Sequence, residues 1–163
     1  MRLVALLLLA ACAGESVTET PTTDTASHVF VADTELADAA SAAAQLWTDA
    51  TAGSFAPTVV MGEAEGIRIR LGDTAGVCTG RVDPWGCWRP SERVIWISPE
   101  VPEKMRVSTI AHEIGHRLGL EHSDEKVALM NPDRNAFRRL SPCVLESDVI
   151  AAGFGGPGAC LWQ

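Results

Sequence analysis

Apolar residues between positions 33 and 50 recur every third or fourth position, a spacing that predicts a helix with one buried face. The residues of that face are Leu36, Ala40, Ala43, Trp47 and Ala50. Asp33 is a candidate N-cap, and Gly53 follows the predicted end of the helix.

Three shorter apolar segments predict strands. Residues 58–61 and 67–71 are strand candidates, and in the second segment Arg68 and Arg70 alternate with apolar neighbours. Residues 93–98 (RVIWIS) are almost continuously apolar, which favours a strand inside a sheet. Residues 72–92 contain Gly, Pro and two cysteines and are expected to be mostly loop.

Two further helices are predicted towards the C-terminus. Residues 102–120 carry apolar positions on one face and a second face that includes two histidines, a pattern typical of a central, buried helix. The last helix is expected to begin at Leu140-Ser141-Pro142, with Ser141 as cap and Pro142 at its first position. It is expected to run to about residue 152, before Gly153.

The N-terminus has the features of an export signal. Arg2 precedes nine apolar residues, a run too short to span a bilayer, which needs about 20. The sequence Leu9-Ala10-Ala11-Cys12 resembles a bacterial lipobox, which implies cleavage before Cys12 and lipidation of its thiol. The alternative is an ordinary secretory signal cut after Ala13. We therefore expect a signal peptide at 1–11, a lipidated Cys and flexible linker at 12–30, and one folded domain at 31–163.

The remaining cysteines fit an exported protein. Cys78, Cys87, Cys143 and Cys160 are even in number, and disulfides persist in oxidising compartments. Four cysteines allow three pairings, of which we predict Cys78–Cys87 and Cys143–Cys160. A site in which all four thiolates bind one metal is the alternative, but no C-x-x-C spacing is present.

The formal charge of −8 makes nucleic acid an unfavourable partner, because an acidic surface repels phosphate. The expected partners are a protein or peptide substrate and, through the lipid, a membrane. We expect a monomer exposed at the periplasmic face or the cell surface of a bacterium.

The chemistry is concentrated in residues 112–122, HEIGHRLGLEH. His112 and His116 are four residues apart, so a helix presents both from one face, a spacing that suits two ligands of one zinc ion. Gly119 can adopt the conformation that ends the helix and turns the chain, which would bring His122 back as a third ligand. Three protein ligands leave one position open, as in catalytic zinc sites. Glu113 is the candidate general base.

These residues resemble the metzincin metallopeptidases, whose motif is H-E-x-x-H-x-x-G-x-x-H followed by a methionine turn. Residues 128–132 (ALMNP) supply a matching turn around Met130, and together with His122-Ser123 they are most similar to the matrixins. The resemblance implies an α+β catalytic domain in which a twisted mixed sheet packs on two long helices, with a third helix at the C-terminus. It also implies one catalytic Zn²⁺ and a cleft between the sheet and the metal.

The sequence also departs from the matrixin pattern. Matrixins usually bind a second, structural zinc through further histidines, but only His28 lies outside the motif, so we expect that site to be absent. We expect no cysteine-switch propeptide before the domain, and Asn131 stands where matrixins often have tyrosine. The chain contains no tyrosine, so the astacins and serralysins, which place one near the metal, do not fit. We expect the two disulfides to replace structural metals as crosslinks.

The resulting prediction is a zinc-dependent endopeptidase that cleaves extracytoplasmic proteins or peptides. The alternatives are a zinc-binding lipoprotein that recognises a partner without cutting it, and a metal-dependent hydrolase of a cell-wall amide. Residues 131–140 (NPDRNAFRRL) are expected to border the substrate pocket. In one hypothesis Phe137 lines that pocket and Arg134, Arg138 and Arg139 favour acidic substrates, and in the other these arginines belong to a solvated loop.

Overall fold

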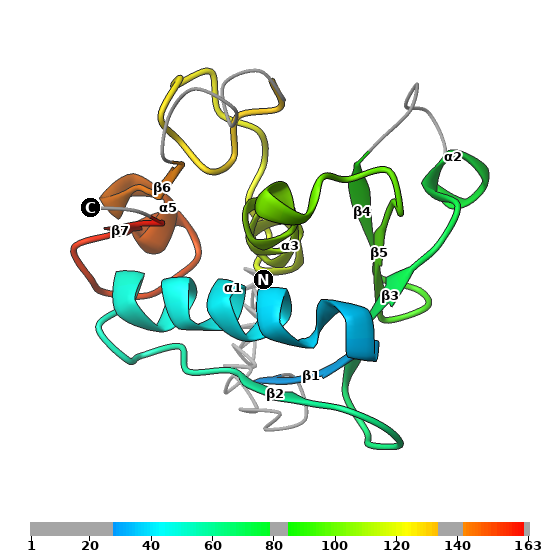
Figure 1. The fold of residues 1–163 in the computed structure, drawn as a ribbon. Coiled ribbons are helices and arrows are strands. Elements are labelled where there is room, and N and C mark those ends of the chain that lie inside the picture. Colours follow the sequence, from blue (N-terminus) through cyan, green and yellow to red (C-terminus); the bar gives the residue numbers. More distant parts are fainter. Residues whose placement is uncertain (1–27, 79–84, 134–141, 162–163) are drawn as a thin grey trace, which may run out of the picture.

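The computed structural model describes residues 28–78, 85–133 and 142–161. Its main feature is a mixed sheet of five strands in the order β2-β1-β3-β5-β4 (Figure 1). The strands are β1 (Val29–Ala32), β2 (Thr58–Val60), β3 (Ile67–Leu71), β4 (Gly86–Arg89) and β5 (Val94–Ile97). Neighbouring strands are parallel except for β4, which pairs antiparallel with β5 and forms one edge.

One face of this sheet is covered by two helices, α1 (Ala37–Ala50) and α3 (Glu103–Arg117). Alternate side chains of the three central strands point to this face and are buried with the helices; they are Phe30, Ala32, Ile67, Ile69, Ile95 and Ile97. The helices also contact each other, since Trp47 Nε1 of α1 donates a hydrogen bond to the Ala111 carbonyl of α3, 2.9 Å away. Because apolar burial of this kind is the main driving force for folding, these contacts fix α3 relative to the sheet.

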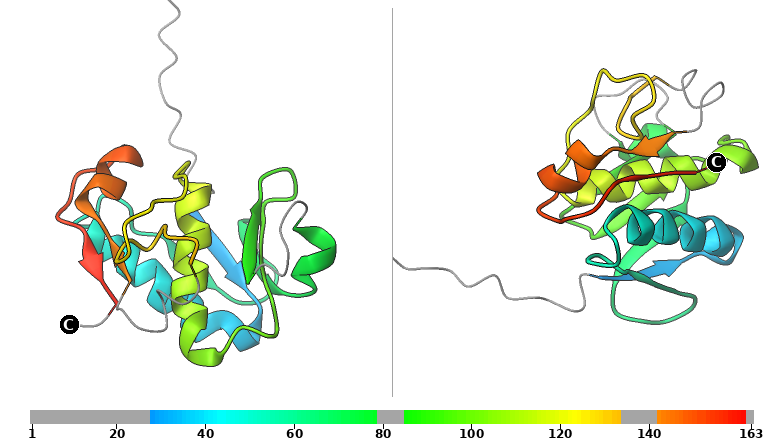
Figure 2. Two further views of the ribbon diagram at one scale, coloured as in Figure 1. Left: turned by 90° about the horizontal axis from the view of Figure 1, so that it is seen from above. Right: turned by 90° about the vertical axis from the view of Figure 1, so that its left-hand side faces the viewer.

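A small C-terminal unit lies on the side of α3 that faces away from β4 (Figure 1). It consists of β6 (Cys143–Val144), α5 (Glu146–Ala151) and β7 (Ala159–Cys160), with β6 and β7 paired antiparallel. Figures 1 and 2 show α3 between this unit and the edge strand β4, so α3 is enclosed on both sides.

Both predicted disulfides are present, Cys78–Cys87 and Cys143–Cys160. The first joins the end of the short helix α2 (Thr74–Val77) to β4, and the second joins β6 to β7. The alternative in which the four cysteines form a metal site is therefore wrong.

The α+β fold and the main predicted elements are confirmed, but several boundaries were wrong. The chain forms a 3-10 turn, η2 (Thr34–Leu36), before α1, and the Asp33 side chain does not cap it: Asp33 Oδ2 instead accepts a hydrogen bond from the Leu71 amide at 3.0 Å. The last helix begins at Glu146 rather than Pro142, because Cys143 belongs to β6. The predicted cap Ser141 lies outside the described residues.

Four strands were not predicted. Val29 was assigned to the linker but begins β1, β4 was assigned to a loop, and the two-residue strands β6 and β7 were missed. Within the described ranges, no helix combines the length and apolar character needed to cross a membrane.

Candidate metal centre

The site is built on the second half of α3. His112 and Glu113 are buried, with 6% and 2% of their surface exposed, and His116 is half-buried one turn later. A spacing of four residues places His112 and His116 on the same face of the helix, with their ring centroids 4.7 Å apart. The predicted placement of these two histidines on one helix face is confirmed.

The chain reverses after α3 at Gly119. This residue has a φ of +89°, a left-handed conformation that glycine adopts without the steric cost of a side chain. The Gly119 amide bonds the His116 carbonyl and the Leu120 amide bonds the Gly115 carbonyl, both at 3.0 Å, which satisfies carbonyls at the helix end. The turn brings His122 back over the helix, so that one ligand atom from each of His112, His116 and His122 lies within 4.8 Å of the others.

Backbone carbonyls set the protonation of two of these rings. His112 Nδ1 lies 2.8 Å from the Leu129 carbonyl, and His116 Nδ1 lies 2.8 Å from the Leu120 carbonyl. A carbonyl oxygen only accepts, so Nδ1 must carry the proton in both rings. In the neutral form, each of these rings therefore presents an unprotonated Nε2 to the site, which is the atom that can bind a metal.

The distances fit a metal ion. His116 Nε2 and His122 Nε2 are 3.1 Å apart. Two nitrogens bound to one zinc ion at about 2.0–2.1 Å with tetrahedral angles lie about 3.3 Å apart. The three histidines can therefore bind one zinc ion with little movement, and their imidazole nitrogens are donors that zinc commonly uses.

Glu113 projects towards the edge strand β4. A Cβ atom added to Gly86 would lie 3.2 Å from Glu113 Cγ and 3.0 Å from the Trp96 carbonyl. The missing side chain at position 86 thus lets the strand approach the carboxylate side chain closely. Glu113 is placed between the histidines of α3 and the edge of the sheet.

Met130 packs against α3 at Gly115, the residue before His116. It is fully buried, and a Cβ added to Gly115 would lie 2.4 Å from its sulfur and 3.3 Å from the Trp47 ring. Gly115 therefore provides the space that Met130 occupies against α3. The Ser123 amide donates to the Met130 carbonyl at 3.0 Å, which ties the turn to the segment that carries His122.

Asn131 stabilises the same turn. It is buried, its Nδ2 donates to the Glu125 carbonyl at 3.0 Å, and its Oδ1 accepts from the Asp133 amide at 2.8 Å. The Asn131 side chain thus closes the loop between residues 125 and 133. Phe137 and the predicted specificity residues Arg134, Arg138 and Arg139 lie outside the described residues.

Sequence reasoning missed the groups that support the site. The carbonyls of Leu120 and Leu129 belong to the backbone and leave no signal in the sequence. Gly86 follows no recognisable pattern. Gly115 did carry a signal, since a glycine inside a helix costs about 1 kcal/mol relative to alanine and therefore indicates a packing requirement.

A helix with two histidines, a third histidine after a glycine turn and a methionine packed against that helix are the features of a metzincin-type site, here beside a mixed sheet. The sequence profile described as Matrixin matches residues 25–150. The chain therefore belongs to the matrixin family, which suggests a zinc metallopeptidase. No curated protein matches the chain significantly.

Proposed function

We propose that the protein is a zinc-dependent endopeptidase that cleaves extracytoplasmic proteins or peptides. The observation that carries this proposal is the convergence of His112, His116 and His122 beside the buried side chain of Glu113. Membership of the matrixin family supports it.

In this proposal the three histidines hold the ion and Glu113 is the catalytic residue. When bound, zinc acts as a Lewis acid toward the scissile carbonyl and lowers the pKa of water towards about 7. Glu113 accepts the proton from the attacking water and delivers it to the leaving amine. Its burial suits this role, because a proton acceptor is more effective where bulk water does not compete.

The edge strand β4 is the proposed binding surface for the substrate backbone. Among the described strands, β4 has a neighbour on one side, β5, and its other side is unpaired. Gly86 brings the main chain of β4 close to the Glu113 side chain. An extended peptide can add to such an edge through main-chain hydrogen bonds. This mode places a peptide bond near the histidines without requiring a particular side chain, which favours an endopeptidase over a hydrolase of cell-wall amides.

Substitution of the proposed base tests the mechanism. Glu113→Gln is expected to keep zinc bound and to lower kcat for casein or a quenched fluorescent peptide by at least 100-fold. The matched control is Glu103→Gln, the same change at the exposed first residue of α3, which is expected to stay within twofold of the wild type. If Glu113→Gln turns over at the wild-type rate, Glu113 is not the base.

The same assays separate the alternatives. A non-catalytic zinc lipoprotein predicts zinc binding without turnover of any peptide. A cell-wall amide hydrolase predicts release of amide-linked muropeptides by the wild type but no cleavage of a peptide library. Endopeptidase activity that a chelator abolishes and added zinc restores supports the proposal.

We also propose that Cys12 carries a lipid that anchors the exported domain to a membrane. The support is the lipobox-like sequence and the two disulfides, which indicate an oxidising compartment. Cys12→Ala is expected to abolish labelling by a fatty-acid analogue and to leave the precursor uncut or soluble. Equal labelling of both forms would contradict the anchor.

A further inference from the structure

The segment that supports His112 is itself held by Cys143. The Cys143 amide donates to the Val127 carbonyl at 2.8 Å, and the Leu129 amide donates to the Cys143 carbonyl at 2.6 Å. These bonds form a parallel bridge between Cys143 and Ala128. Leu129 is thus fixed through its amide by Cys143, while its carbonyl contacts His112 Nδ1.

The local ladder alone gives Cys143 little support. Strands β6 and β7 have two residues each, and a ladder of that length is not stable in water without further contacts. Cys143 and Cys160 lie directly opposite each other in this ladder and are joined by the disulfide. The covalent bond therefore supplies what the short ladder lacks.

The far end of this connection is attached to α1. The Gly158 amide, next to β7, donates to the Ala50 carbonyl at the end of α1, 3.1 Å away. A Cβ added to Gly158 would lie 2.5 Å from the Val144 carbonyl, so β7 and β6 approach closely here. A continuous path thus runs from α1 through β7, the disulfide and β6 to Leu129 and His112.

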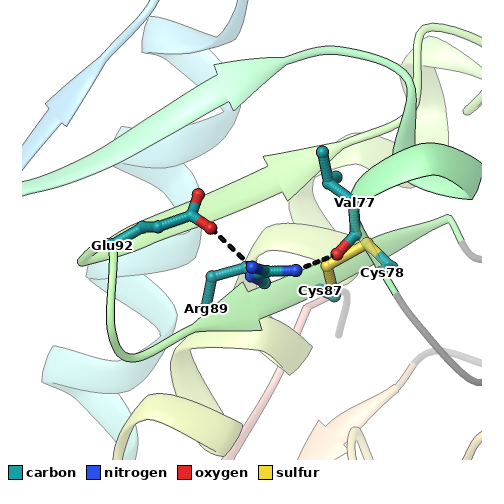
Figure 3. Close-up of polar contacts among 5 residues, drawn as sticks. All are labelled: Val77, Cys78, Cys87, Arg89 and Glu92. Atoms are coloured by element: carbon teal, nitrogen blue, oxygen red, sulfur yellow. Dashed lines mark hydrogen bonds and ion pairs between the residues drawn. A yellow bond between two sulfur atoms is a disulfide. The ribbon is translucent and has the colours of Figure 1, made fainter.

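The other disulfide, Cys78–Cys87, lies on the opposite side of α3 from Cys143–Cys160 and provides an internal comparison (Figure 1). Cys87 joins β4 to Cys78, and Arg89 reinforces the link by donating to the Val77 carbonyl and pairing with Glu92 (Figure 3). Cys87 follows Gly86, the residue of β4 that lies against the Glu113 side chain.

We propose that Cys143–Cys160 is a positioning element of the metal centre, which holds the Leu129 carbonyl against His112 and so fixes the ring tautomer and orientation for metal binding. The proposal deepens the proposed function and rests on the metal site that it assumes. The Cys78–Cys87 disulfide positions the edge strand instead and contributes little to metal affinity. The two disulfides therefore have separable roles.

The test compares two matched variants of the full chain, Cys143→Ala/Cys160→Ala and Cys78→Ala/Cys87→Ala. Zinc affinity is measured by competition with a chromophoric chelator, after circular dichroism has shown that each variant is folded. Loss of a group that orients a metal-bound histidine typically weakens metal binding about 10- to 100-fold. We expect a loss in this range for the first variant and a change within about twofold for the second. Hydrogen exchange of the amides in residues 127–131 should accelerate only in the first.

A second measurement covers the case in which the first variant does not fold. In Cys78→Ala/Cys87→Ala, Cys143–Cys160 is the remaining disulfide, so mild reduction and alkylation of the zinc-loaded protein break it alone. Zinc should then be released at least tenfold faster than before reduction. Where Cys143→Ala/Cys160→Ala folds, reduction and alkylation of its Cys78–Cys87 disulfide should leave the zinc release rate nearly unchanged.

The outcomes separate this proposal from the proposed function. Equal zinc affinities in both variants and the wild type, or equal losses in both variants, would overturn the positioning role even if the enzyme cleaves peptides. A selective loss in Cys143→Ala/Cys160→Ala, with no peptide cleaved by the wild type, would support the positioning role and reject the endopeptidase.

Discussion

At the scale of single residues, Gly115 leaves the space in which Met130 packs against α3. A methyl group at position 115 would lie 2.4 Å from the Met130 sulfur and 3.3 Å from the Trp47 ring. Met130 and Trp47 are fully buried, so neither side chain can move into solvent to make room. The glycine thus couples the helix that carries two histidines to the turn below them.

We predict that Gly115→Ala destabilises the protein by about 1–3 kcal/mol, the usual cost of overpacking a core, despite the higher helix propensity of alanine. Zinc affinity should fall as well, because displacing Met130 also displaces the neighbouring Leu129 carbonyl. The matched control is Gly155→Ala, where an added Cβ has no atom within 4 Å. Urea unfolding and chelator competition check both effects, and a Gly115→Ala protein as stable as the control would contradict this packing.

A second residue-scale feature is the carboxyl group of Asp148 in α5. Burial is the main cause that raises its pKa above the ordinary 3.8; the hydrogen bond from the Leu145 amide lowers it, and the charge of Glu125 raises it. The folded state therefore disfavours the ionised form. Below the pKa of the unfolded state, the carboxyl is protonated in both the folded and the unfolded protein, so its burial causes no loss of stability at such pH values. The loss of stability develops as the pH rises through the pKa of the folded state.

Asp148→Asn should relieve this loss, because asparagine keeps an acceptor for the Leu145 amide without the charge. We predict that the variant is more stable than the wild type at pH 7, and that the difference shrinks as the pH is lowered below about 4, near the ordinary aspartate pKa. Urea unfolding at several pH values measures this trend. The control is Glu146→Gln, exposed in the same helix; a difference that does not change with pH would contradict the prediction.

At the scale of elements, a buried side-chain hydrogen bond from Trp47 to the Ala111 carbonyl joins the two long helices. Trp96 of β5 provides a contrast, because its buried indole N–H has no hydrogen-bond partner among the described residues. Substitution by phenylalanine removes the N–H and part of the ring in both cases. Only at Trp47 does it also remove a hydrogen bond and leave a buried carbonyl with one partner fewer.

We predict that Trp47→Phe lowers the free energy of unfolding by about 2–4 kcal/mol and that Trp96→Phe costs clearly less, since it also removes an unsatisfied polar group. Chemical denaturation of the two variants gives the comparison directly. Equal losses would show that ring volume, rather than the hydrogen bond between α1 and α3, determines the cost.

The sequence predicted the elements whose apolar pattern is long or regular. The strand of residues 67–71 follows its alternation, with Ile67 and Ile69 buried, and the helix of residues 102–120 follows the three- and four-residue spacing of its apolar positions. Strand β4 (GCWR) has no such pattern; it exists because it pairs with β5 and is crosslinked through Cys87. Tertiary pairing of this kind is not visible in a local window.

The end of the chain shows the same limit. Pro142 suggested the first turn of a helix, but Cys143 pairs with Val127, Leu129 and Cys160, and so extends the strand before α5 can begin. The approach of His112 to His116 was predictable because helix geometry fixes their spacing, and that of His122 because Gly119 ends the helix in a turn. Their supporting carbonyls were not, because any residue supplies a carbonyl and only the fold decides which one faces a ring.

At the scale of the whole molecule, the proposed metal would connect α3 to the segment that follows the Gly119 turn. His112 and His116 belong to α3, whereas His122 follows the Gly119 turn and is exposed. An ion bound to all three crosslinks the helix to the loop that leads to the methionine turn. Because the unfolded chain does not preserve this arrangement, binding favours the folded state.

Thermal stability should therefore depend on free zinc. We predict that the unfolding temperature of the chelator-treated protein rises with zinc concentration, with a gain of about 2.7 kcal/mol when free zinc is 100 times the dissociation constant. The gain should decrease at acidic pH, because imidazole nitrogens must be unprotonated to bind. Differential scanning fluorimetry of His116→Ala, which should lose the response, and of His28→Ala, whose histidine packs on Phe55 away from the group, provides the matched pair. A zinc response that survives in His116→Ala but disappears in His28→Ala would place the ion elsewhere in the chain.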